Sequence, residues 1–229
     1  YPLIGRYISG TAASGLYEAR LGFEEMGKEN HVYSPAYTAA EIDALRTLCS
    51  HIIFNSIRQF ETFYPRLSGV SAGLRINPQH STQSGAIYDP CAPYSRLGIT
   101  RAHFPDALPA GVEGFHMHTL CEQDADALAV TLKAVEATFG DLLPKMKWVN
   151  FGGGHHVTRP GYDLATLEQC ICQVQAKYGV RVYLEPGEAW ALNAGYLITT
   201  VLDTLQNGDT SLAICLLYTS DAADDRISV

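Results

Sequence analysis

The sequence predicts an α/β protein: a (β/α)8 TIM-type barrel, incomplete at its N-terminus, followed by the start of a C-terminal β-domain. Short apolar runs alternate with longer amphipathic stretches, which is the pattern of parallel strands connected by helices. The alternation repeats about seven times in units of roughly 25 to 35 residues, which favours a barrel over an open sheet. Polar or glycine-rich residues follow several apolar runs, where a barrel places its active site.

Each expected element follows from this periodicity. We predict strands at the short apolar runs 31–33, 51–54, 70–76, 113–118, 147–151 and 180–184. We predict helices over the amphipathic stretches 14–26, 38–48, 56–64, 123–139 and 163–178. Residues 77–99, rich in Pro, Ser, Gln and Gly, are too long for a simple connector, and such loops usually carry function.

The chain is expected to have three parts. Residues 1–187 form the barrel, whose first strand is missing. Small and β-branched residues without a helical stripe then follow, so residues 188–212 are expected to begin a β-domain. Residues 213–229, which include the acidic segment SDAADD, continue neither pattern and are interpreted as a non-native tail.

Composition narrows the classes of function. The 229 residues are 47% hydrophobic and 17% charged, which is enough apolar material for a large core. The net charge of −8 opposes a nucleic-acid-binding surface or a basic membrane anchor and suits a cationic or small polar ligand. No apolar run approaches the roughly 18 residues of a membrane span, and the first residues lack the layout of a signal peptide. We therefore expect a cytoplasmic protein without nucleic-acid or membrane partners.

The cysteines lack the dense spacing of a disulfide framework, so we interpret them as thiols of a reducing compartment. They are Cys49, Cys91, Cys121, Cys170, Cys172 and Cys215. A helix would place Cys170 and Cys172 about 200° apart, which argues against a shared metal.

A run of glycines, Gly152, Gly153 and Gly154, follows the apolar strand that ends at Phe151. Consecutive glycines expose backbone N–H groups and allow an anion to approach closely. The run is therefore interpreted as a phosphate-binding loop, with an ordinary glycine turn as the alternative.

Two histidines, His116 and His118, lie two residues apart at a predicted strand end, so both side chains are expected on one face, toward the barrel interior. They could be a metal-ligand pair completed by His155, His156 or Glu185. One ring could instead lie flat against an aromatic cofactor. Two interior histidines with purely structural contacts are the third reading.

Two charged side chains end further strands. Glu185 lies at the tip of the last predicted barrel strand, where a buried carboxylate needs a cationic partner. A protonated pyridine nitrogen would satisfy it and would remain an effective electron sink. Arg75 ends another strand, where its guanidinium can organise polar groups or hold a carboxylate.

These residues carry a resemblance to a known family. The chain resembles the carboxynorspermidine/carboxyspermidine decarboxylases, relatives of the alanine-racemase-like, fold-type III pyridoxal-phosphate decarboxylases. The resemblance covers residues 1–212 in unbroken order. The motifs that carry it are LRINP, DPCAPYSRLGIT, GFHMHTLCEQ, FGGGHH and LEPGEA.

The resemblance implies pyridoxal 5′-phosphate as the cofactor. His116 matches the histidine that stacks on the cofactor ring, and Glu185 matches the carboxylate paired with the pyridine nitrogen. Thr119 and the glycines at 152–154 would hold the phosphate, and Arg75 would support His116 and the cofactor.

The resemblance also implies the reaction. The family decarboxylates carboxynorspermidine or carboxyspermidine to norspermidine or spermidine in polyamine biosynthesis, and a homodimer is expected at full length. Glu188 stands where related decarboxylases have an arginine, and a carboxylate there would bind an amine of the polyamine substrate.

The Schiff-base lysine of the family has no match in this chain. Lysines occur at positions 28, 133, 145, 147 and 177, and none ends a predicted strand. Because the family carries this lysine on the first barrel strand, we expect it upstream of Tyr1 and expect the fragment to be inactive alone.

Two other functions remain open at this point. A metal-dependent barrel hydrolase would use His116 and His118 as ligands and would need no phosphate loop. A non-catalytic pyridoxal-phosphate-binding protein would share the barrel and the glycine loop but would normally lack a second domain.

Overall fold

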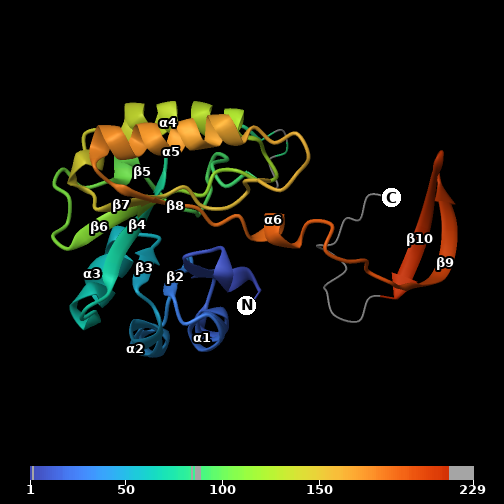
Figure 1. Cartoon of the computed structure of the whole chain (residues 1–229), viewed down its shortest axis with the longest axis horizontal. Coiled ribbons are helices and arrows are strands. Elements are labelled where there is room, and N and C mark those ends of the chain that lie inside the picture. The colour runs from blue at the N-terminus through green and yellow to red at the C-terminus, as the bar shows by residue number, and fades with distance from the viewer. Residues whose placement is uncertain (2, 84, 86–88, 217–229) are drawn as a thin grey trace. The chain divides into compact units, whose positions relative to one another are not determined.

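The computed structural model describes residues 1, 3–83, 85 and 89–216. Contacts divide the chain into two compact units, Tyr1–Leu192 and Asn193–Val229, and the second is described as far as residue 216. The first unit contains a curved sheet with helices, and the second contains a separate hairpin (Figure 1).

The first unit is built on an 8-stranded sheet in which every pairing is parallel. Its strands are β1 (Gly10–Ala13), β2 (Glu29–Tyr33), β3 (His51–Phe54), β4 (Ser71–Asn77), β5 (Ile99–Thr100), β6 (Val112–His116), β7 (Trp148–Asn150) and β8 (Arg181–Tyr183). The main path runs β1-β2-β3-β4-β6-β7-β8, and β5 pairs with β4 beside it. The sheet curls into a half-barrel, which confirms the predicted α/β class and a TIM-like arrangement of parallel strands and helices.

Helices connect the strands as the periodicity predicts. They are α1 (Leu16–Glu25), α2 (Ala39–Leu48), α3 (Ile57–Phe63), α4 (Ala125–Phe139), α5 (Leu164–Tyr178) and α6 (Gly187–Ala191). Short 3-10 turns are η1 (Ile4–Arg6), η2 (Tyr64–Arg66), η4 (Arg101–His103) and η5 (Leu143–Lys145). No helix in the described part of the chain is long and apolar enough to cross a membrane.

Side-chain caps fix where several helices begin. Thr38 accepts a hydrogen bond from the backbone of Glu41, whose carboxylate accepts one from the backbone of Thr38, so α2 starts with a complete capping box. Ser56 and Asp163 cap α3 and α5 in the same way, each by accepting a backbone N–H. These caps set the bounds of the helices that follow the strands.

The core lies between the sheet and its outer helices. All four residues of β3 are buried, as expected for a parallel strand covered on both faces. Helices α4 and α5 lie side by side over the sheet (Figure 1). Helix α4 buries Leu128, Leu132, Val135 and Phe139, which follow one another at helical spacing.

Aromatic and imidazole rings pack together inside the half-barrel. The rings of His31 and His51 lie 3.9 Å apart, and Trp148 lies 5.2 Å from His51. Tyr183 lies 4.6 Å from His31. A side-chain carbon on Gly114 would overlap the Trp148 ring, so this strand position needs glycine. These four rings form the aromatic floor, a packed layer inside the half-barrel made of His31, His51, Trp148 and Tyr183.

One ion pair crosses the open side of the half-barrel. Arg181 in β8 donates to the carboxylate of Glu29 in β2 over 3.1 Å, and Tyr183 reaches the same carboxylate. Among the described strands, β1 and β8 do not pair with each other. Side chains therefore span the gap that backbone pairing leaves.

The second unit is an antiparallel hairpin of β9 (Thr200–Asn207) and β10 (Thr210–Leu216). This confirms β structure in the C-terminal part. The expectation of strand from residue 188 onward is wrong for its first residues, because residues 188–191 lie in α6, which follows the Pro186-Gly187 turn. Residues 213–216 belong to β10, and the rest of the predicted tail, 217–229, lies outside the described residues.

Candidate functional site

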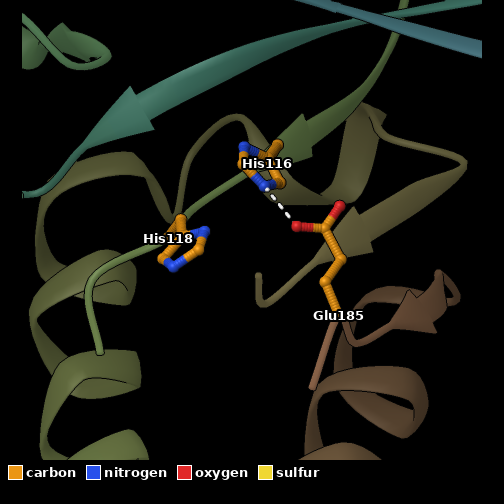
Figure 2. Close-up of side chains that lie close together, drawn as sticks. All are labelled: His116, His118 and Glu185. Atoms are coloured by element: carbon orange, nitrogen blue, oxygen red, sulfur yellow. Dashed lines mark hydrogen bonds and ion pairs between the residues drawn. The ribbon is translucent and has the colours of Figure 1, made fainter. Parts of the chain in front are cut away.

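Four neighbouring strands end at one edge of the half-barrel and bring polar side chains together there. Arg75 lies on β4, His116 ends β6 and Asn150 ends β7, while Glu185 follows β8. Figure 2 shows His116, His118 and Glu185 converging, with the contact between His116 and Glu185 dashed. The sequence predicted three of these four strand-end residues and missed Asn150.

Glu185 is an ionised carboxylate in a mostly buried position. His116 Nε2 lies 3.2 Å from Oε2 of Glu185, and Asn150 donates to Oε1 over 2.7 Å. Burial alone would raise the pKa of Glu185, but the charge of His116 and the hydrogen bonds from His116 and Asn150 lower it to about 2. The carboxylate therefore keeps its negative charge at neutral pH and can hold a cationic group.

Asn150 joins this carboxylate to the glycine run. Its side-chain amide donates to Glu185, and its Oδ1 accepts the backbone N–H of Gly152 over 2.8 Å. Asn150 is fully buried, so the amide fixes both partners at once. No motif in the sequence marks this role, and only a polar residue at the end of an apolar strand could have signalled it.

His118 lies outside the strand, contrary to the expectation that it shares a face with His116. Strand β6 ends at His116, so the two-residue alternation does not extend to His118, and the two rings meet at 76° with centroids 6.2 Å apart. Burial, followed by the charges of His116 and Arg75, lowers the pKa of His118 to about 4. His118 is therefore a neutral ring beside the site.

Arg75 is buried and supports the site from behind. Its Nη2 donates to the backbone oxygen of His118 over 2.9 Å. Its guanidinium also lies 4.6 Å from the ring centre of Tyr33, and that ring lies 5.2 Å from His116. Tyr33, which the sequence analysis missed as a site residue, thus contacts both Arg75 and His116.

The glycine run makes a tight turn packed against the loop that follows β6. Gly152 and Gly154 have φ of +73° and +81°, and a side-chain carbon on either would collide with a carbonyl oxygen of the neighbouring loop. Thr119 lies in that loop, and its hydroxyl is buried without a hydrogen-bond partner among the described residues. The second ring nitrogen of His116, Nδ1, is likewise buried and unpaired in the described part of the chain. Such buried polar atoms call for a polar ligand.

A cavity of about 670 Å³ opens beside Glu185. It lies between β1 and β8 and is lined by Gly10, Thr11, His31, Asn150 and Tyr183 together with Glu185. The cavity therefore follows the gap between the two edge strands of the open sheet, and Glu185 lies at its border.

The metal-ligand reading is only partly matched by the geometry. His116, His118 and Glu185 each offer a ligand atom within 4.8 Å of the others. His155 instead contacts the backbone oxygen of Phe151 at 3.4 Å. His156 lies 3.1 Å from Glu188, away from the first group. The structure therefore does not bring the two neighbouring histidines to the His116 cluster.

The lysines and most of the cysteines lie away from the strand ends, whereas Cys121 lies in the loop after β6, beside Gly154. The lysines are at the surface: Lys28 donates to the backbone of Gly5 and Ile8, and Lys177 pairs with Glu136. The cysteines are free thiols, with Cys170 buried and Cys172 exposed on opposite sides of α5. Neither set contributes to the site.

Comparisons with solved structures show which class of fold the chain has. No family model matches the chain. A solved structure of diaminopimelate decarboxylase matches with a TM-score of 0.63 and 17% identity over 93% of this chain and 61% of that one, which shows a shared fold. The chain has the fold of the fold-type III decarboxylases.

A more specific relationship comes from closer relatives. Carboxynorspermidine/carboxyspermidine decarboxylase of Campylobacter jejuni is 43% identical over 98% of this chain and 62% of its own length. Carboxyaminopropylagmatine decarboxylase of Synechocystis is 41% identical over 93% of this chain and 56% of its own length. The chain is a homologue of the carboxynorspermidine/carboxyspermidine decarboxylases, which confirms the resemblance predicted from the motifs.

A solved structure supports the same relationship. Carboxynorspermidine decarboxylase from Campylobacter jejuni, complexed with norspermidine, has a TM-score of 0.79 and 44% identity, covering 93% of this chain and 55% of that one. The chain thus spans little more than half the length of the relatives it matches. These relatives are all named decarboxylases.

Proposed function

We propose that this chain is part of a pyridoxal-phosphate-dependent decarboxylase that converts carboxynorspermidine or carboxyspermidine to norspermidine or spermidine. The single observation that carries the proposal is the ionised Glu185, held by His116 and Asn150 beside the glycine run. The names of the homologues supply the reaction class and the substrates. A cytoplasmic homodimer is part of the same proposal.

The residues present fit the cofactor. The backbone N–H groups of Gly153 and Gly154 and the unpaired hydroxyl of Thr119 would bind its phosphate, while the N–H of Gly152 is held by Asn150 Oδ1 and fixes the start of the loop. The buried ring of His116 would pack on its pyridine ring, with Tyr33 and Arg75 behind the histidine. Bound pyridoxal phosphate supplies an electron sink for the carbanion left when CO₂ departs.

Glu185 would keep the pyridine nitrogen of the bound cofactor protonated. Because its pKa is about 2, the carboxylate stays ionised and favours a proton on a nearby ring nitrogen. Asn150 keeps the carboxylate in place through its hydrogen bond to Oε1. Neutral His118 adds no second positive charge beside the protonated ring.

Glu188 would bind an ammonium group of the substrate. Its side chain is 55% exposed, so it can reach a ligand from solvent, and its carboxylate is opposite in charge to a polyamine. The negative net charge of the chain favours the approach of such a cation.

The test uses full-length protein carrying this chain and measures CO₂ release from carboxynorspermidine and carboxyspermidine. Glu185→Gln removes the charge but keeps the shape, and we expect kcat to fall by about a hundredfold or more, the range of a lost acid–base partner. Glu168→Gln, an exposed carboxylate on α5, serves as the matched control and should keep wild-type kcat.

Cofactor binding is measured on the same proteins by visible absorbance and borohydride trapping on a lysine. Wild-type protein is expected to retain pyridoxal phosphate through dialysis. Stoichiometric zinc without bound pyridoxal phosphate would contradict the decarboxylase and favour the hydrolase that uses His116 and His118. Bound cofactor without any CO₂ release would favour the non-catalytic binding protein.

A further inference from the structure

A second group of ionisable side chains gathers beyond the glycine run. Glu122 follows β6, His156 follows β7, and Glu188 lies in α6 just after β8. One ligand atom of each lies within 4.8 Å of the others, and His156 Nε2 is 3.1 Å from Glu188 Oε2. These three side chains follow the adjacent strands β6, β7 and β8. His116, Asn150 and Glu185 come from the same strands in the same order.

The histidine of this group points into it without a hydrogen bond. The His156 side chain is 7% exposed, and its Nε2 is buried with no hydrogen-bond partner among the described residues, despite its short distance to Glu188. A buried polar atom in that state calls for a further partner.

The two carboxylates of the group, Glu122 and Glu188, have no lysine or arginine partner among the described residues. Arg159, the nearby cation, pairs with Asp124 at 2.6 Å. Two like charges this close repel each other unless a cation lies between them.

We propose that Glu122, His156 and Glu188 form a binding site for an alkylammonium group, the charged end of a polyamine chain. The three N–H donors of a primary ammonium match one oxygen of Glu122, one oxygen of Glu188 and the unpaired Nε2 of His156. The proposal deepens the proposed function, on which it rests for the identity of the amine, and adds Glu122 and His156 to Glu188.

The surroundings favour an ammonium over a metal ion. The two carboxylates of the group, Glu122 and Glu188, are exposed and adjustable. An ammonium tolerates such adjustable partners, and a metal site demands fixed ones.

The test is calorimetric titration of the chain with norspermidine at low salt, without cofactor. Glu122→Gln and Glu188→Gln are expected to weaken binding about tenfold each, because each removes a charged hydrogen-bond partner. Glu168→Gln changes the net charge equally on an exposed part of α5 and is expected to stay within about twofold of wild type. Thermal unfolding of each variant verifies that the fold is intact.

Three results would overturn the proposal. They are the absence of saturable norspermidine binding to the wild-type chain, equal affinities in Glu122→Gln and Glu168→Gln, and stoichiometric Zn²⁺ binding that requires Glu122 and Glu188 while norspermidine binding does not. Failure of the proposed function looks different. In that case full-length protein would release no CO₂, yet Glu122→Gln would still weaken norspermidine binding.

Discussion

At the scale of single residues, three histidines are neutral rings, of which His31 and His155 are buried and His118 is half-buried. Burial lowers the pKa of His31 to about 3 and the pKa values of His118 and His155 to about 4. In the unfolded chain these rings titrate near 6.5. Between about pH 6.5 and 4 the unfolded state therefore binds more protons than the folded state, so stability falls as the pH falls through this window.

Urea unfolding at pH 7.5, 6 and 5 measures this effect. We expect the free energy of unfolding to decrease below pH 6.5, and to decrease less steeply in His155→Asn because one buried titrating ring is gone. His103→Asn replaces an exposed histidine and should keep the wild-type dependence. A free energy that is unchanged from pH 7.5 to 5 would contradict the prediction.

The sequence identified the charged and glycine positions of the site but missed the residues that connect them. Glu185 and the glycines stand out because a strand-end carboxylate and consecutive glycines are chemically unusual. Tyr33 and Asn150 belong to no motif, and their roles depend on which strands become neighbours. Sheet pairing decides such contacts, and local sequence does not encode them.

At the scale of elements, caps and periodicity explain most of the bounds. The strands at 51–54 and the helix ending at 178 agree with their predictions. Strand β1 was missed because its residues, GTAA, are small and few and show no apolar run. Helix α6 was read as strand because five residues are too short to show a helical period.

The capping box of α2 gives a prediction at this scale. Thr38→Ala removes the acceptor for the Glu41 backbone and is expected to lower the free energy of unfolding by about 1 kcal/mol. Thr47→Ala, in the last turn of the same helix, removes only a bond to the carbonyl of Ala44 and should leave stability within about 0.5 kcal/mol. Equal losses in the two variants, measured by urea unfolding, would argue against the cap.

At the scale of the whole molecule, the polar residues of the candidate site lie together at one edge of the half-barrel. The strand ends hold Glu185, His116 and the glycine run, while the aromatic floor, which includes His31, lies inside the half-barrel. His31 also lines the cavity between β1 and β8, so this layer and Glu185 border the same space. The barrel pattern predicted this polarity, because strand ends in such folds face one side.

The ion pair between Glu29 and Arg181 bears on the order of folding. Its partners are 152 residues apart, so the contact forms only after most of the intervening units have assembled. A late contact is absent from the transition state, and its loss speeds unfolding without slowing folding. In stopped-flow measurements, Arg181→Gln should unfold about two- to fourfold faster at an unchanged folding rate, whereas Arg46→Gln, which breaks a local pair with Asp43, should leave the unfolding rate nearly constant. A slower folding rate in Arg181→Gln would contradict this prediction. It would mean that β2 and β8 already contact each other in the transition state, before the strands between them have packed.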